Sequence, residues 1–300
     1  MEKLTRNPET DLFEEPNHFM GLPLVHQRSL SSMKFRTRLQ AAHTIPLENG
    51  HTLDFLSRLK SAEALYVVFH GAIAPDKLYY PRFERESSLR KLQAASLHFA
   101  DPTLLHSKDR SMRLSWYLGG PGWDPILEIA HVVRTAMRQM GTENVAFLGG
   151  SGGGFAALRI SALFPGSLAF VQDPQTEVMR YYTGAVRRYF DTMWPGQNRA
   201  TLVQQFPDRF DVNHLYAHYI PNNFVYYYQG ITDDFHRKGH YNPFLAAIGC
   251  KEGGRSYDTP NRKMVLAHGE IEGHGKITPQ EFETHFELAT KWWLGTKYQM

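Results

Sequence analysis

The stretch GGSGGGFAAL, Gly149 to Leu158, follows the apolar run NVAFL and precedes residues that favour a helix. A strand that turns directly into a helix, with a side chain presented at the turn, needs backbone angles and space that glycine provides. Gly149 and Gly153 stand two residues before and after Ser151, which gives the pattern G-x-S-x-G between a strand and a helix. This context predicts that Ser151 is a nucleophile at a strand-to-helix turn.

The same turn would place Ser151 at the N-terminus of a helix. Free backbone N–H groups and the helix dipole favour a developing negative charge there, so the N–H of Gly152 is a candidate oxyanion donor. Two other glycine-rich loops fit less well. A phosphate-binding loop of the Walker type needs Lys and Ser or Thr after its last glycine, where this chain has Phe155-Ala156. A dinucleotide fingerprint usually follows the first strand of its domain, whereas these glycines lie in the middle of the chain. A turn that only connects strand to helix stays an alternative.

Composition indicates an ordinary globular protein. The 300 residues are 42% hydrophobic and 21% charged, enough for one large domain or two small ones. The formal net charge of +3 comes from 33 basic and 30 acidic residues spread along the chain, so we expect no nucleic-acid partner. A single cysteine, Cys250, cannot form an internal disulfide and fits a reducing compartment. With a polar start and no run near the roughly 20 apolar residues of a membrane span, we expect a soluble, cytoplasmic protein.

Strand and helix patterns alternate along the chain, which predicts the α/β class: a mostly parallel sheet with helices on both faces. The expected strands include residues 65–69, 96–100, 144–148, 168–172, 223–228 and 263–268, with helices at 124–137, 155–164 and 279–293. Weaker strand patterns lie at 34–47 and 51–56. The resulting division is an N-terminal extension (1–35), a core (36–176 and 224–300) and a helical, aromatic-rich and Arg-rich cap insertion (177–223).

The order of these elements, with G-x-S-x-G in its place, resembles the α/β-hydrolase superfamily over about residues 36 to 295. That resemblance implies a nucleophile, an acid and a base in this chain order, on loops that follow successive strands. It also implies a second oxyanion N–H after an earlier strand, where His70-Gly71-Ala72 stands. Ala72 is the expected donor and Gly71 the alternative, while His70 is expected to orient the loop.

The acid is expected after the strand that follows the cap. Asp233, in the sequence Gly230-x-x-Asp, has the spacing that the family commonly uses, with Asp234 as its competitor. Asp173, after the strand that precedes the cap, is a weaker rival. The base is expected after the last strand, and His274, between two glycines that would let it reach over Ser151, is preferred to His268. Ser151, Asp233 and His274 would form a catalytic triad.

Asp233, His236 and His240 also resemble a set of metal ligands, because His236 and His240 are four residues apart and would share a helix face. No strong motif supplies a further ligand. We therefore expect neither a metal nor another cofactor, and we expect His236 and His240 to line the pocket or to bond loop backbone. Further pocket candidates are Trp116, Arg180 and Tyr181, whose aromatic faces and charge suit a sugar or a carboxylate. Taken one at a time, the aromatic residues of the cap are more simply read as packing.

A narrower resemblance is carried by HGA, ADPTL, SWYLGG, GSGGGFAAL, DPQT and YYYQGITDDFHRKGHYNPF. These segments resemble bacterial α/β-hydrolases of surface-polysaccharide synthesis and of accessory-secretion glycoprotein O-acetylation, except that Gln229-Gly230 replaces an expected Gln-Asn turn. The resemblance implies an ester hydrolase that acts through an acyl-enzyme on an acylated, for example O-acetylated, carbohydrate or small molecule. The alternatives are an O-acyltransferase that uses a glycan hydroxyl and, in another class, a non-catalytic binding protein. A serine peptidase is disfavoured because no propeller-like domain is evident.

Overall fold

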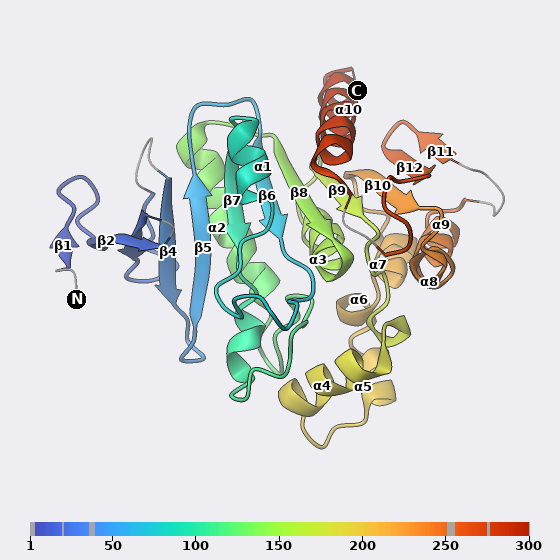
Figure 1. Cartoon of the computed structure of the whole chain (residues 1–300), viewed down its shortest axis with the longest axis horizontal. Helices are drawn as coiled ribbons and strands as arrows, with labels where there is room; N and C mark the ends of the chain where they lie inside the picture. The colour runs from blue at the N-terminus through green and yellow to red at the C-terminus, as the bar shows by residue number, and fades with distance from the viewer. Residues whose placement is uncertain (1–3, 20, 36–39, 251–255, 275–276, 300) are drawn as a thin grey trace.

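The computed structural model describes residues 4–299 apart from 20, 36–39, 251–255 and 275–276. Twelve strands of the described residues form one sheet in the order β1-β2-β3-β4-β5-β7-β6-β8-β9-β10-β12-β11 (Figure 1). The first six are β1 (Thr5–Arg6), β2 (Phe13–Phe19), β3 (Leu22–His26), β4 (Gln40–Pro46), β5 (Thr52–Arg58) and β6 (Leu65–Phe69). The others are β7 (Ala95–Phe99), β8 (Val145–Gly150), β9 (Leu168–Gln172), β10 (Phe224–Gly230), β11 (Ser256–Thr259) and β12 (Arg262–Ala267).

The centre of the sheet is parallel, as predicted. Strands β7, β6, β8, β9, β10 and β12 pair in parallel, and antiparallel partners flank this block. Helices outside residues 177–223 include α1 (Glu86–Lys91), α2 (Pro125–Met140), α3 (Ser151–Ser161), α9 (Asn242–Ala247) and α10 (Pro279–Lys297). No helix within the described ranges is long and apolar enough to cross a membrane.

Helices cover both faces of the sheet because alternate residues of each strand point to opposite sides. On one face, Val67 of β6 belongs to a core cluster with residues of α2 and α3. On the other face, the next residue, Val68, belongs to a cluster with Leu89 of α1 and with Phe282 and Trp293 of α10. The continuous apolar runs of the central strands are therefore explained by burial on both sides, and the predicted fold class is confirmed.

The N-terminal segment contains three strands that its sequence did not predict. Strand β3 pairs in parallel with β4, and β2 and β1 follow it outward. Gln27 ties this segment to the sheet: its amide joins Lys34, and its Nε2 lies 3.1 Å from Nδ1 of the buried His43 on β4. Main-chain pairing at a sheet edge requires no alternating apolar pattern, which is why the residues alone did not reveal these strands.

Most of the regular structure in residues 177–223 is helical. They form the short helices η2 (Val178–Arg180) and α6 (Pro207–Phe210) together with α4 (Thr183–Met193), α5 (Arg199–Gln205) and α7 (Val212–Tyr219). Its aromatic residues pack on the core: Tyr189 is buried and donates a hydrogen bond to Gly119 O at 3.0 Å. Arg209 donates to the carbonyl groups of Leu118, Gly120 and Trp123, which fixes the loop before α2. This packing role is the plainer of the two interpretations offered for the aromatic residues.

The turn between β8 and α3 is packed against β6 at backbone distance. A Cβ atom on Gly153 would overlap the carbonyl oxygen of Phe69, and one on Gly149 would overlap the carbonyl oxygen of Gly153. A Cβ on Gly154 would lie 2.5 Å from Pro174 Cβ. These glycines are present because neighbouring backbone, which cannot rotate away, occupies the space of a side chain.

Gly153→Ala should lower the free energy of unfolding by roughly 1–3 kcal/mol or more, because the added methyl group displaces backbone in a close-packed core. Gly184→Ala is the matched control: its Cβ would meet nothing within 4 Å, on an exposed face of α4. That substitution should stabilise the helix by about 0.5–1 kcal/mol. Urea unfolding measures both. Equal effects of the two substitutions would contradict the packing argument.

The buried histidines make stability depend on pH. Burial lowers the pKa of His43 to about 3, below an ordinary value of about 6.5, so His43 is neutral when folded and gains a proton on unfolding in mild acid. The unfolded state then binds more protons, so stability falls as pH falls from 6.5. His43→Gln should remove about 2 kcal/mol of the loss in unfolding free energy between pH 7 and pH 5. An unchanged pH dependence in this variant would contradict the assignment.

Candidate active site

The predicted site residues converge at the carboxyl ends of the parallel strands, the edge where open α/β sheets bind ligands. Gly71 follows β6, Ser151 follows β8, Asp173 follows β9, Asp233 follows β10 and His274 follows β12. A cavity of about 310 Å³ opens at this edge. Its lining includes Gly71, Ala72, Ser151, Tyr181 and His274.

Ser151 has the geometry of a nucleophile elbow. Its φ of 53° lies in the left-handed region, which costs energy for a residue with a side chain and is a feature of functional turns. Residue 151 is the first of α3, so the helix N-terminus points at it. A Cβ added to Gly71 would lie 3.4 Å from Ser151 Cβ and 3.8 Å from Gly152 N. The His70-Gly71-Ala72 loop and Gly152 thus flank Ser151, as the predicted oxyanion hole requires.

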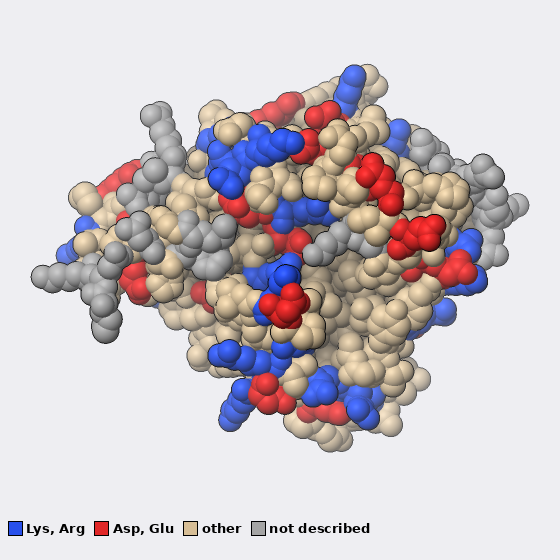
Figure 2. Space-filling model, in the orientation of Figure 1, with Lys and Arg blue, Asp and Glu red and all other residues tan. Residues whose placement is uncertain are grey.

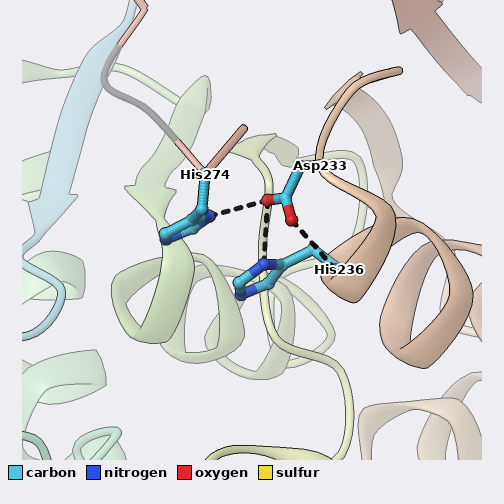
Figure 3. A group of neighbouring side chains, drawn as sticks. All are labelled: Asp233, His236 and His274. Carbon is cyan, nitrogen blue, oxygen red and sulfur yellow. Dashed lines mark hydrogen bonds and ion pairs between the residues drawn. The ribbon is translucent and has the colours of Figure 1, made fainter. Parts of the chain in front are cut away.

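Asp233 and His274 form a hydrogen-bonded pair (Figure 3). His274 Nδ1 lies 2.8 Å from Asp233 Oδ2, which leaves the Nε2 atom of His274 available to another partner. Asp233 is buried, whereas His274 is exposed and borders the cavity. Among the described residues no hydrogen bond joins His274 to Ser151, although both line the cavity.

His236 shares the carboxylate of Asp233. Its Nδ1 lies 2.8 Å from the same Oδ2 atom, and its backbone N–H donates to Oδ1 at 3.2 Å. The imidazole rings of His236 and His274 stack with centroids 3.9 Å apart and planes 14° from parallel. Burial alone would raise the pKa of Asp233, but the contacts with His236 and His274 lower it well below its usual range. Asp233 therefore stays ionised next to both rings.

Gln175 is a site residue that the sequence reasoning did not select. Its Nε2 donates to Ser151 Oγ at 2.6 Å, and its backbone N–H donates to Ser151 O at 3.1 Å. The indole N–H of Trp116 donates to Gln175 Oε1 at 2.7 Å, which fixes the orientation of the amide. Because Gln175 gives Ser151 Oγ a proton donor, the hydroxyl hydrogen of Ser151 remains free to bond a base. The segment DPQT was one of those that carried the narrower resemblance. Its glutamine was not selected as a site residue because a neutral amide is neither an acid nor a base.

The alternative acids and base lie in different surroundings. Asp234 is exposed and forms ion pairs with Lys238 at 2.8 Å and with Arg237. His268 is also exposed. Asp173 is buried beside the cavity, where its Oδ1 accepts from Gly230 N at 2.7 Å and from Gln229 Nε2 at 2.9 Å. Burial raises the pKa of Asp173 to about 6. Of the aspartates considered, Asp233 is the one that contacts His274.

The remaining pocket candidates separate into supporting and lining residues. His70 is buried, with Nδ1 near its own loop at Gly71 O and Nε2 accepting from Asp101 N. His240 is buried and its Nδ1 accepts from Thr176 N, while Arg180 pairs with Glu177 at the surface. Trp116 is buried and holds the amide of Gln175 through the hydrogen bond described above. Tyr181 lines the cavity; burial raises the pKa of its phenol, and the neighbouring Ser151 hydroxyl acts in the opposite direction.

The three side chains that could hold a metal are Asp233, His236 and His274. They differ from the set that the sequence spacing suggested. Ligand atoms of Asp233, His236 and His274 lie within 4.8 Å of one another, whereas spacing suggested His240 in place of His274. One carboxylate and two imidazoles suit a transition metal. Asp233 and His274 are already joined by a hydrogen bond, and Nδ1 of His236 lies at ion-pair distance from the same carboxylate.

The fold of the whole chain is similar to that of known structures. A scan against protein-family models and a search of curated protein sequences found no match. Among solved structures, the capsule O-acetyltransferase of Neisseria meningitidis serogroup A is similar at 15% identity and a TM-score of 0.59, over 92% of this chain and 96% of that one. An S-formylglutathione hydrolase from Agrobacterium tumefaciens is similar at 13% identity and 0.54, over 88% and 96%.

A third similar structure is the Glycosylation Associate Protein (Gap123) complex from Streptococcus agalactiae, at 12% identity and a TM-score of 0.55. The match covers 84% of this chain and 45% of that chain. At these identities the likeness concerns the fold. Together with the strand order, the serine turn and the helices on both faces, it identifies the chain as a protein of the α/β-hydrolase fold.

Proposed function

We propose that this protein is a serine-dependent ester hydrolase that acts through an acyl-enzyme formed on Ser151. The observation that carries the proposal is the Asp233–His274 pair, 2.8 Å long, at the border of the cavity that Ser151 also lines. Fold resemblance alone would not distinguish an enzyme from a binding protein. An ionised buried acid, an oriented imidazole and a strained serine at one cavity favour the enzyme.

The proposed reaction starts when His274 Nε2 removes the Ser151 proton as Oγ attacks the ester carbonyl. The backbone N–H groups of Gly152 and Ala72 would stabilise the oxyanion, a contribution of about 3 kcal/mol for each donor in comparable sites. Collapse of this intermediate expels the alcohol, which takes the proton from His274 and leaves the acyl group on Ser151. Water, deprotonated by His274, then releases the acid. Because the described residues show no hydrogen bond between His274 and Ser151, we expect this bond to form when substrate binds.

Transfer of the acyl group to a sugar hydroxyl is the second candidate, because one of the similar structures is a capsule O-acetyltransferase. Hydrolysis and transfer share the acyl-enzyme and differ in the nucleophile that ends the cycle. Monosaccharide acceptors added during turnover of 4-nitrophenyl acetate distinguish the two. Acetylated sugar detected by mass spectrometry supports transfer, whereas acetate as the sole product supports hydrolysis. A glycan ester or small-molecule ester substrate fits both candidates.

Ser151→Ala should abolish labelling by a fluorophosphonate and lower kcat for 4-nitrophenyl acetate by about 10³-fold or more, because the covalent route is lost. Ser31→Ala, at an exposed serine outside the cavity, is the control and should label normally. Gel fluorescence and absorbance at 400 nm provide the two readouts. Labelling that survives in Ser151→Ala would refute the proposed nucleophile.

Adjacent aspartates provide a matched pair for the acid. Asp233→Asn should lower kcat by roughly 10⁴-fold, because an amide cannot stabilise the imidazolium or hold its tautomer. Asp234→Asn removes the same charge one residue later, at a surface ion pair, and should change kcat less than about twofold. Steady-state kinetics on 4-nitrophenyl acetate compares them. A larger loss in Asp234→Asn would transfer the role to that residue.

A further inference from the structure

Arg85 lines the same cavity as Ser151, and its guanidinium contacts uncharged groups. Nη2 donates to Gln172 Oε1 at 3.1 Å, and Cζ lies 4.4 Å from the ring centroid of Phe282, close enough for a cation–π contact. An arginine has five N–H donors in a planar fork. These two contacts, with one amide oxygen and one ring, therefore use only a small part of the hydrogen-bonding capacity of Arg85.

The other cationic side chains of the cavity have carboxylate partners. Arg82 pairs with Glu84 at 3.0 Å and Lys77 pairs with Asp76 at 2.8 Å. No carboxylate of the described residues forms an ion pair with Arg85. Figure 2 shows that Lys and Arg are interspersed with Asp and Glu over the face it displays, so this face carries no large area of one charge.

Burial makes this uncompensated charge costly. It lowers the pKa of Arg85, although Glu84 acts in the opposite direction, and the guanidinium remains protonated at neutral pH. Glu84 lines the same cavity but forms no ion pair with Arg85, so an anion that enters the cavity and bonds the guanidinium directly would relieve the cost of its burial. The backbone of Arg85 has a φ of 56°, a left-handed conformation that a side-chain-bearing residue adopts at an energetic cost and that occurs often at ligand sites.

Asp173, the acidic side chain nearest to Gln172 in the chain, does not compensate Arg85. Its Oδ1 accepts from Gly230 N and Gln229 Nε2 instead. The lining of the cavity thus includes the Arg85 guanidinium, which has no ion-pair partner among the described residues, together with Ser151 and His274.

We infer that Arg85 binds an anionic group of the substrate, a carboxylate or a phosphate, which lies in the cavity while the ester is at Ser151. Guanidinium and carboxylate or phosphate match as planar, bidentate partners. This inference rests on the proposed function in placing an ester at Ser151. It assigns the substrate a negative charge that the serine chemistry itself does not require.

The first experiment compares three esters: 4-nitrophenyl acetate, which is neutral, mono-4-nitrophenyl succinate, with a carboxylate in the acyl part, and 4-acetoxy-3-nitrobenzoate, with a carboxylate in the leaving group. We expect wild type to favour one anionic ester. Arg85→Gln should lower the ratio of its kcat/KM to that of the neutral ester by about tenfold or more, chiefly through KM. Arg85→Lys, which keeps the charge but loses the fork, should restore part of the ratio.

Arg90→Gln is the control for net charge. Arg90 lies on α1 with an exposed side chain paired to Glu86, outside the cavity, and its loss should change the ratio less than about twofold. Circular dichroism checks that all variants are folded. A ratio that is the same in wild type, Arg85→Gln and Arg90→Gln for both anionic esters would overturn the inference, while Ser151-dependent hydrolysis of the neutral ester would leave the proposed function intact.

A binding measurement decides the inference if no ester is hydrolysed. Calorimetry with N-phenylsuccinamic acid, phenyl phosphate and neutral acetanilide tests the anion site without turnover. We expect at least one anion to bind wild type more tightly than acetanilide does, and to lose about tenfold in affinity in Arg85→Gln. Equal binding of all three ligands, or anion binding that Arg85→Gln leaves unchanged, would refute the role of Arg85.

Discussion

The close approach of the first turn of α3 to the backbone of β6 is the constraint on which the rest of the molecule depends. Gly153 lies against the carbonyl group of Phe69, and that contact brings the ends of two neighbouring strands together. One strand end then carries Ser151 and the other the His70-Gly71-Ala72 loop. Packing and function are thus the same requirement at this point, since any side chain at residue 153 would move the serine away from its neighbours.

Much of the fold could be predicted from the sequence because the central strands are buried on both faces. Residues 65–69 and 168–172 were predicted as strands and form β6 and β9 with these bounds. Helix α10, predicted at 279–293, has Thr278 as its N-cap in a capping box with Glu281. Strands β1 to β3 were missed because few of their side chains are buried: both residues of β1 are exposed and β3 buries only Val25, so no apolar pattern marks them.

The candidate site likewise contains residues that the sequence predicted and residues that it did not. Ser151, Asp233 and His274 follow the ends of β8, β10 and β12 in chain order, and this order located them in the sequence. The buried polar residues around these three side chains could not be predicted from chain order. Trp116, Gln175 and His236 lie far apart in sequence, and their contacts arise only after the loops pack. The pairing of these polar atoms in hydrogen bonds depends on the conformations of the loops, and no local sequence pattern specifies those conformations.

The short outer strands have a consequence for the behaviour of the molecule in concentrated solution. A sheet of twelve strands could present a long row of unpaired N–H and C=O groups at each side, which is a template for joining other molecules into fibrils. One described edge is the four residues of β11, which offers few groups to an incoming strand. On the other side β1 pairs only with Phe13 and Glu14, so the rest of β2 also lies at the edge, and an incoming strand would find more backbone groups there.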